Sequence, residues 1–433
     1  MKCLNSSNSK AASCTVKSSA NGSNTGKKIA ILGGGLAGRL LAWRLASCRE
    51  TISKHSDLAN RPNDCNYSHL TESDYNLDNG IKSITEIQVF EKGSLTPHLS
   101  ESDKAAAFTA AAMISPMSEL VASELDIYHW GQTSLALWPQ WLQQLDCPQH
   151  FHQHGSLVLA HPNDLAELHQ FKRDLDYKLT DLKSKNLPLQ QPYHDSAPYH
   201  DSAPYQLLSD QHQIAELEPG IGPNFQQGLF LKDEAHIDHH PVLAQLVEQA
   251  QALGVQFHQN HAVNINDSAS SDSSLSDFDI IFDCRGMGSK ADLRANSLRG
   301  VRGEVIWLEC KEITLSRPIR LMHPRYKLYV VPKPNHQFII GATEIESEDS
   351  SPISLRSSME LLSALYAINP AFAEARILAQ DSNLRPAYID NLPKIEQRLS
   401  DSGQPIICIN GLYRHGYLIG PAIIEQAIQK AFL

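Results

Sequence analysis

A glycine-rich turn near the start of the chain, GGGLAG at residues 33–38, constrains the fold more than any other feature. The apolar run Ile29–Leu32 before it is typical of a buried parallel strand, and Leu36–Ala46 has the pattern of a helix. Gly33 permits the tight turn, Gly35 lets the backbone approach a pyrophosphate, and Gly38 lets the helix lie close to the sheet. A glycine turn without a ligand is the alternative, but the flanking strand and helix favour a dinucleotide.

The acidic residue that such folds use to bind a ribose hydroxyl is expected at the end of the second strand. Here it is Glu91, which follows the apolar run Ile87–Phe90 and precedes Lys92. Its distance from Gly38 far exceeds the usual spacing of about 20 residues. The intervening stretch Cys48–Ser83 is polar and shows neither helical nor alternating periodicity, so we interpret it as a surface insertion whose removal restores the spacing.

Length and charge restrict the class of protein. A chain of 433 residues can bury two sizeable cores, which predicts two domains. Its formal charge is 37 − 48 = −11, which argues against nucleic acid or an anionic membrane as a partner. Its 8 cysteines show no C-x-x-C spacing, and no apolar run reaches the roughly 18 residues of a membrane span. Because residues 1–27 lack the apolar core of a signal peptide, we expect a disordered tail and a cytoplasmic location.

Strands and helices alternate along most of the remaining chain. Closely spaced strands between residues 301 and 343 indicate a more antiparallel sheet in a second domain. The polar stretches 192–205 and 267–277 are expected to be exposed loops. The other predicted elements are a helix at 241–254, strands at 255–258, 279–283 and 406–410, and a final helix after Pro421.

Two later segments argue that the ligand is FAD rather than a nicotinamide. Asp283–Gly288 directly follows a predicted strand, and Asn410–Pro421 lies between a strand end and a helix start. A ligand that touches both the first glycine motif and this last segment must be long and central, as FAD is.

With these motifs in place, the chain resembles the D-amino acid oxidase superfamily, and within it the glycine oxidase branch used in thiamine synthesis. The resemblance covers nearly the whole chain beyond Lys28 and rests on GGGLAG, FEKG, AAAFTAAAMISP, DCRGMGS, VRGE, YVVP with GATE, LRPAYIDNLPKI and NGLYRHGYLIGPA. It implies a Rossmann-like FAD-binding domain with a parallel sheet, of the glutathione reductase type, and an α+β substrate domain with a mixed or antiparallel sheet. We expect the first domain at 28–115, 236–300 and 381–433, and the second at 116–235 and 301–380.

The resemblance also implies where the flavin lies. The adenosine half would lie near Glu91 and Val263 and the isoalloxazine near Ala111–Met113, with the last helix pointing its positive end at the flavin. The run before Met113 is AAA where related oxidases often have Gly, which predicts a narrower space over the flavin. The residues expected to bind the cofactor are Gly33, Gly35, Leu36, Ala37, Gly38, Glu91, Lys92, Ala111, Ala112, Met113, Val263, Arg285, Gly286, Gly411, Gly416, Tyr417 and Leu418.

By the same resemblance, Arg385 would bind a substrate carboxylate, Arg414 would lie beside the flavin edge, and Tyr329 would close over the substrate. The planar fork of an arginine suits a carboxylate because it forms two parallel hydrogen bonds. The alternatives are that Arg385 braces a loop through backbone carbonyls, and that Tyr329 is present because tyrosine is favoured in strands.

Two histidine-rich segments look like metal ligands but are not expected to bind a metal. In His236–His240, Asp238 precedes Pro241 and a helix, which favours a helix start with histidines on a surface turn. His150, His152 and His154 alternate along an apparent strand, but no carboxylate is evident beside them.

Together these features predict an FAD-dependent enzyme that oxidises a small, glycine-like amine or amino acid to the imine by hydride transfer to flavin N5. Dioxygen or another acceptor would reoxidise the flavin. If the acceptor is dioxygen, the product is hydrogen peroxide. The rival functions are a dehydrogenase, a flavoprotein acting on an amine within a larger molecule, and a non-catalytic dinucleotide-binding assembly factor. A homo-oligomer is left open.

Overall fold

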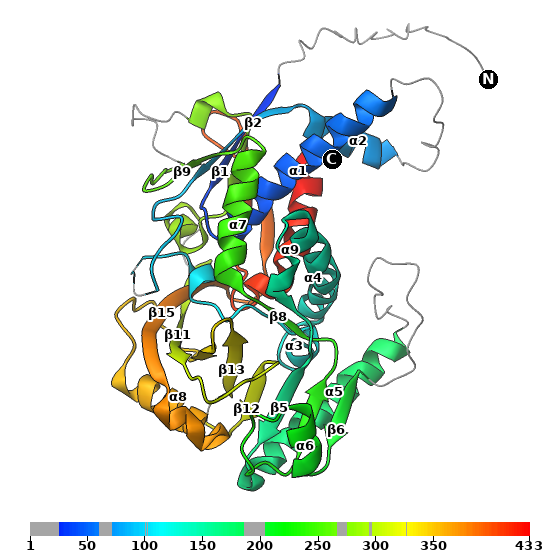
Figure 1. The fold of residues 1–433 in the computed structure, drawn as a ribbon. Helices are drawn as coiled ribbons and strands as arrows, with labels where there is room; N and C mark the ends of the chain where they lie inside the picture. Colours follow the sequence, from blue (N-terminus) through cyan, green and yellow to red (C-terminus); the bar gives the residue numbers. More distant parts are fainter. Residues whose placement is uncertain are drawn as a thin grey trace, which may run out of the picture.

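The computed structural model describes residues 26–59, 72–99, 101, 103–185, 204–265, 275–293, 297–325 and 327–433. The chain forms a six-stranded sheet, an eight-stranded sheet and a three-stranded sheet. Figure 1 shows the first in the upper part of the molecule and the second in the lower part. The first lies with three helices, and β8 (Ala235–Ile237) lies between the two sheets. The helices are α1 (Leu36–Ala59), α7 (His239–Ala252) and α9 (Gly416–Phe432). Most of the predicted tail and of the polar stretches 192–205 and 267–277 lies outside the described residues.

The six-stranded sheet has the order β16-β17-β10-β1-β2-β9, and only the β16–β17 pair is antiparallel. Apolar side chains of β1 pack on both of its faces, Ile29 and Ile31 beneath the helices and Ala30 and Leu32 on the opposite face. A strand buried on both sides needs a continuous apolar run, which is why this strand was recognisable from its sequence. The strands are β1 Lys27–Leu32, β2 Ile84–Phe90, β9 Gln256–His258, β10 Ile280–Asp283, β16 Lys394–Leu399 and β17 Pro405–Asn410.

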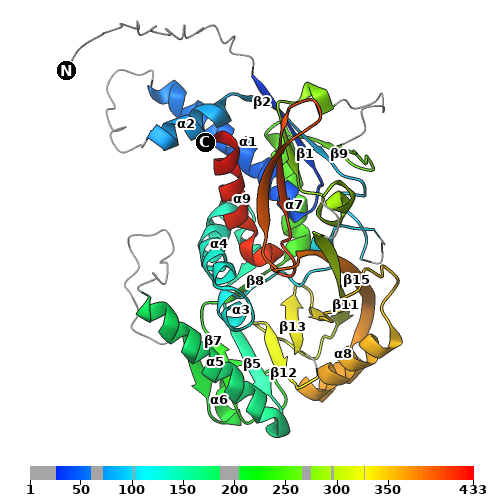
Figure 2. The same ribbon diagram turned by 180° about the vertical axis from the view of Figure 1, so that it is seen from behind.

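The eight-stranded sheet has the order β15-β11-β14-β13-β12-β5-β7-β6 and is antiparallel except where β12 pairs with β5. Alternate residues face opposite sides: Ile306 and Leu308 pack in the cluster beneath α8 (Leu355–Ile368), whereas Val305 and Trp307 face the rest of the molecule. Figure 2 shows α5 and α6 on this lower part of the molecule and α8 beside β15. The strands are β5 Ser156–Ala160, β6 Tyr205–Leu208, β7 Gly228–Leu231, β11 Leu298–Glu309, β12 Ile319–Met322, β13 Lys327–Lys333, β14 Gln337–Gly341 and β15 Arg376–Tyr388.

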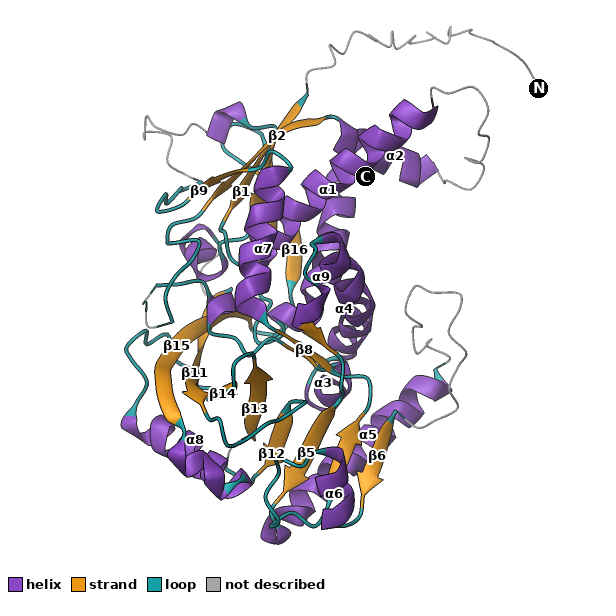
Figure 3. Cartoon of the chain, in the orientation of Figure 1, coloured by secondary structure: helices purple, strands orange, loops and turns teal. Residues whose placement is uncertain are grey.

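A small antiparallel sheet, β3-β8-β4, lies between the two large ones (Figure 3). Its strands are β3 Met113–Ile114, β8 Ala235–Ile237 and β4 Phe151–His152. The remaining described helices are α3 Pro116–Ala122, α4 Leu125–Gln144, α5 Leu165–Ser184, α6 Gln211–Leu217 and α7 His239–Ala252, besides short 3-10 turns. None of the helices in the described ranges is long and apolar enough to cross a membrane.

These sheets confirm the predicted α/β class with one parallel and one largely antiparallel sheet. The boundaries expected at 300 and 381 fall inside β11 and β15. Moreover, α4 contributes Trp138 and Trp141 to the core cluster of α1. The division into two domains therefore stays a proposal, with boundaries at the ends of these strands.

The surface insertion predicted at 48–83 was wrong in its described parts. Helix α1 runs from Leu36 to Ala59, well beyond the expected end at Ala46, and α2 covers Glu72–Lys82. The guanidinium of Arg49 donates to the carbonyl of Leu253, which fixes the extension of α1 to the end of α7. Leu77 and Ile81 pack against the core one helical turn apart, so a two-residue apolar stripe in a polar sequence was enough to place α2.

The last helix, α9, begins at Gly416 rather than after Pro421 as predicted. A proline within a helix leaves the carbonyl four residues before it without its usual donor, and here that carbonyl belongs to Tyr417. The indole Nε1 of Trp138 on α4 donates to it at 2.8 Å, deep in the core. This hydrogen bond lets α9 continue through Pro421 and fixes its first turns against α4.

We predict that Trp138→Phe lowers the free energy of unfolding by about 1–3 kcal/mol, because it leaves the buried Tyr417 carbonyl without a donor. Urea unfolding measures the change. Trp130→Phe is the control, since Trp130 lies on the same helix and is only partly buried. Equal losses in the two variants would contradict the role of this hydrogen bond.

Candidate active site

The glycine turn connects β1 directly to α1. Gly33 has a φ of +98°, and a Cβ atom there would lie 2.7 Å from the carbonyl oxygen of Cys284. A Cβ on Gly38 would lie only 1.8 Å from the carbonyl oxygen of Gly33, so helix and turn are in direct backbone contact. The first turn of α1 begins with Leu36, Ala37 and Gly38, whose N–H groups have no partner within the helix.

Glu91 lies against this turn, as predicted from its place after β2. One carboxylate oxygen accepts a hydrogen bond from the backbone N–H of Gly34 at 2.6 Å, and the other accepts from Gly93 at 3.0 Å. The backbone of Glu91 is also bound, to His258 and His261. Its neighbour Lys92 is exposed.

Arg39, on the first turns of α1, is a residue that the sequence analysis missed. Its buried guanidinium donates to the carbonyls of Gly34, Leu95 and Leu243, and it lies 5.1 Å from the ring centre of Phe108. Burial lowers the pKa of Arg39 to about 10. This side chain joins the glycine turn to α7. The signal in the sequence is an arginine within the apolar run Leu36–Ala42.

The predicted residues after β10 are bound by other groups of the same chain. The guanidinium of Arg285 forms ion pairs with Asp283 at 2.8 Å and Asp292 at 2.5 Å, and approaches the carbonyl of Val263 at 3.4 Å. Gly286 has a φ of +57°, and its carbonyl accepts a hydrogen bond from the side chain of Asn410. Arg285 therefore stabilises this loop through its ion pairs with Asp283 and Asp292.

The segment at the end of the chain meets the middle of the fold, as expected for a long central ligand. Gly411 has a φ of +74°, and a Cβ there would lie 2.3 Å from the ring of Tyr388. Gly416, Tyr417 and Leu418 form the first turn of α9. The hydroxyl of Tyr417 donates to the carbonyl of Ala107, which links this turn to the segment that precedes Ala111.

Ala111, Met113 and Tyr329 lie in one cluster on the inner face of the eight-stranded sheet, together with Trp307. Ala112 has a φ of +57°, a conformation that favours glycine. Burial raises the pKa of Tyr329, so its hydroxyl stays protonated at neutral pH.

Arg385 lies in strand β15, and both of its hydrogen bonds go to backbone carbonyls, as the loop-bracing alternative supposed. Its guanidinium donates to the carbonyls of Arg302 at 3.3 Å and Thr343 at 3.1 Å, and it makes no ion pair with a carboxylate of the described residues. Arg320 on β12 lies opposite Tyr329 on β13 in the strand register. The sequence did not point to Arg320. Arg320 and Arg385 both lie near Tyr329, and the charges of the two arginines act on the Tyr329 hydroxyl.

Arg414, expected beside the flavin edge, forms two ion pairs in the structure. Its guanidinium is bound on one side by Glu119 and on the other by Glu344, each at 3.0 Å. Although burial acts in the opposite direction, the hydrogen bond and charge of His415 and the charge of Arg414 lower the pKa of Glu119 well below its usual range. With two carboxylates already bound, Arg414 is less available to a further anion than Arg385.

Lys333, at the end of β13, is another unpredicted buried group. Its ammonium nitrogen donates to the carbonyls of Ala111 at 2.9 Å and Ile237 at 2.5 Å. Burial lowers the pKa of Lys333 to about 7. The side chain therefore connects β13 to the segment before β3 and to β8.

These residues fit an extended dinucleotide such as FAD. A Cβ on Gly35 would lie 3.4 Å from the side chain of Ala105, so the absence of a side chain at Gly35 keeps room for a phosphate beside the turn. Glu91 lies next to the turn, and the first turns of α1 and α9 both offer N–H groups. The residues predicted to bind the cofactor come from six separate segments of the chain.

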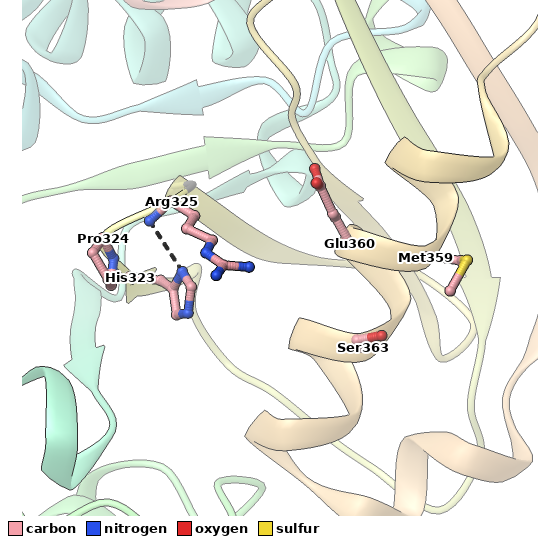
Figure 4. Close-up of a pocket in the computed structure, with 6 residues that line it drawn as sticks. All are labelled: His323, Pro324, Arg325, Met359, Glu360 and Ser363. Carbon is pink, nitrogen blue, oxygen red and sulfur yellow. Dashed lines mark hydrogen bonds between the residues drawn. The ribbon is translucent and has the colours of Figure 1, made fainter.

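A hollow on the surface of the second sheet is not part of this site. It is lined by His323, Pro324 and Arg325 after β12 and by Met359, Glu360 and Ser363 of α8 (Figure 4). It contains none of the predicted residues and lies beside the outer helix α8, so we assign it no role in the reaction.

Comparisons with known proteins agree with this arrangement. Residues 77–429 match the family model "FAD dependent oxidoreductase" (DAO). The chain is 35% identical over 321 residues to the "Putative thiamine biosynthesis oxidoreductase ThiO" of Rhizobium etli, covering 74% of this chain and 83% of that protein. Among solved structures, glycine oxidase from Geobacillus kaustophilus has a TM-score of 0.64 at 19% identity, over 93% of this chain and 95% of that one. Iminodiacetate oxidase from Chelativorans sp. BNC1 has a TM-score of 0.64 at 16% identity, over 93% and 94%. These two structures are similar in fold, and the glycine oxidase type of fold predicted from the sequence is confirmed.

The low pKa of Lys333 predicts a pH dependence of stability. Between about pH 7 and pH 10 the unfolded chain keeps a proton on this lysine that the folded chain has lost, so the free energy of unfolding rises with pH in that range. We expect Lys333→Met to remove up to about 1.4 kcal/mol per pH unit of this rise. Denaturant unfolding of the FAD-loaded proteins from pH 6 to pH 10 measures it. Parallel curves for the two proteins would show that Lys333 is charged in the folded state.

Proposed function

The chain belongs to the DAO family of FAD dependent oxidoreductases, and we propose that it oxidises a small amino acid, glycine or a near relative, with dioxygen as the electron acceptor. The products would be the imine, which water hydrolyses to a keto acid and ammonia, and hydrogen peroxide. The 35% identity to ThiO supports a role in thiamine synthesis.

The observation that carries this proposal is the state of Arg385. It is a partly buried arginine on the inner face of the sheet, and only backbone carbonyls bind it. Arg414 and Arg285 were also predicted to lie at the site, but each of them is paired with two carboxylates. Arg385 forms no ion pair with a described carboxylate, although its charge acts on Glu344. Such a cation favours an anionic substrate, and its planar fork suits a carboxylate.

Tyr329 lies on the same inner face of the sheet as Arg385 and supports the proposed position of the substrate carboxylate. Its hydroxyl would lie 3.0 Å from a Cβ placed on Gly341, two residues before the Thr343 carbonyl that Arg385 contacts. Glycine at 341 therefore keeps room for the ring. Because burial raises the pKa of Tyr329, its hydroxyl remains a hydrogen-bond donor to a substrate oxygen.

Bound FAD would supply a two-electron acceptor for the oxidation of the amine to the imine. The chain would supply position: Arg385 holds the carboxylate, so the α-carbon faces Ala111–Met113, where the flavin ring is proposed to lie. The apolar side chains of Met113, Trp307 and Val305 exclude water from that face.

Anaerobic addition of glycine, sarcosine, and D- and L-amino acids to the purified yellow protein tests the substrate class. We expect a small amino acid to bleach the flavin and air to restore its colour with hydrogen peroxide. Slow return of the colour in air would indicate a dehydrogenase. A yellow protein that none of these compounds bleaches would favour an amine within a larger molecule or a non-catalytic role.

Arg385→Lys should lower kcat/KM for the amino acid by roughly 10- to 150-fold, the equivalent of about 1.5–3 kcal/mol for a hydrogen-bonded charge. The loss should be much smaller for an amine of the same size without a carboxylate. Arg356→Lys is the matched control, because Arg356 is exposed on α8. If both substrates lose equally in Arg385→Lys, the arginine supports the fold and does not bind the carboxylate.

A further inference from the structure

Two histidine-containing segments that are far apart in the sequence meet in the three-stranded sheet. Strands β4 and β8 pair so that His152 lies directly opposite His236. Directly opposed residues of an antiparallel pair point to the same face, and these two rings stack with their centres 4.8 Å apart. Taken separately, each segment lacked the other's ligands, which is why no metal was expected from the sequence.

Asp238 supplies the carboxylate that was missing beside His150 and His152. One of its oxygens, Oδ2, accepts a hydrogen bond from His152 Nε2 at 2.8 Å and from His150 Nδ1 at 3.3 Å. Asp238 stands at the N-cap of α7, where a capping role was predicted, but its side chain makes no cap hydrogen bond. The carboxylate serves the histidines instead.

The expectation that these residues lie on a surface turn was wrong for His236 and Asp238. Each is only 3% exposed. His236 Nδ1 and Asp238 Oδ1 are buried and have no hydrogen-bond partner among the described residues. Buried polar atoms without partners are rare in folded proteins and often mark the place of an ion.

We propose that His152, His236 and Asp238 bind a divalent transition-metal ion of the zinc type. Each residue offers one ligand atom, and the three atoms lie within 4.8 Å of one another, a group that small side-chain adjustments bring around one ion. Two imidazole nitrogens and one carboxylate oxygen are a ligand set that zinc uses, with further positions left to water or to His150.

The surroundings suit an ion that enters from solvent and then holds strands together. The side chain of His152 is 31% exposed and that of His150 is 21% exposed, so the ion has a path, while His236 and Asp238 form the rigid inner side. The nearby ammonium of Lys333 makes its hydrogen bonds to the carbonyls of Ala111 and Ile237, which leaves the three ligands unoccupied by it.

The ion would connect β4 to β8, and β8 in turn pairs with β3. His236 lies opposite Met113 in that second pair, so the ligand is one strand away from a residue proposed to lie beside the flavin ring. The ion would therefore stabilise the strand on which the flavin rests, without taking part in the oxidation.

The test uses the full-length, FAD-loaded protein, freed of metal with a chelator and titrated with zinc against a chromophoric zinc indicator. We expect one zinc ion per chain, and His152→Ala to weaken binding by more than about 10-fold. His154→Ala is the matched control, because His154 lies two residues away and outside the proposed ligand group. It should bind zinc as the wild type does.

Two further measurements keep the outcome clear. Zinc should raise the melting temperature of the wild type and of His154→Ala, but not that of His152→Ala, which is expected to fold because His152 is partly exposed. Cobalt should give ligand-field bands in the wild type that Asp238→Asn weakens. Absence of stoichiometric zinc binding in the wild type, or binding of equal strength in His152→Ala, overturns the proposal.

Discussion

The contact between Gly38 and the carbonyl of Gly33 is the constraint on which the rest of the structure depends. Because no side chain separates them, α1 starts directly above the end of β1 and its free N–H groups face the same space as Glu91. Arg39 then extends this arrangement, since its three hydrogen bonds bind the turn to α7 and to residue 95. The cofactor site is thus built on one close backbone contact and one buried arginine.

The other end of the chain is brought to this point by α9 and its contacts with α4. Pro421 removes one hydrogen bond from α9, and Trp138 replaces it from a neighbouring helix. The first turn of α9 is thereby fixed beside the segment that leads to Ala111, and the chain's last and first elements meet. The inner face of the eight-stranded sheet closes the third side, with Tyr329 and Arg385 on it. The proposed substrate site depends on all three parts, because the glycine turn, the first turn of α9 and the inner face of the sheet each contribute residues to it.

Features that depend on local sequence were predictable, and those that depend on distant pairing were not. The strand at 29–32 and the glycine turn have patterns set by neighbouring residues, and Glu91 follows from its place after β2. In contrast, α2 was missed because only Leu77 and Ile81 mark its buried side. The ion pairs of Arg414 with Glu119 join residues 295 positions apart, and no short motif indicates them. The same is true of His152 and His236, which only the pairing of β4 with β8 brings together.

We propose that a flavin lies between the glycine turn and the inner face of the sheet, with a carboxylate held by Arg385. A crystal structure of the FAD-loaded protein with bound acetate would test it directly. It should show the pyrophosphate at the first turn of α1, a ribose hydroxyl on Glu91, the ring against Ala111–Met113, and the acetate oxygens on the Arg385 guanidinium. A flavin ring elsewhere, or acetate held by Arg414 with Arg385 still bound only to backbone carbonyls, would contradict the account.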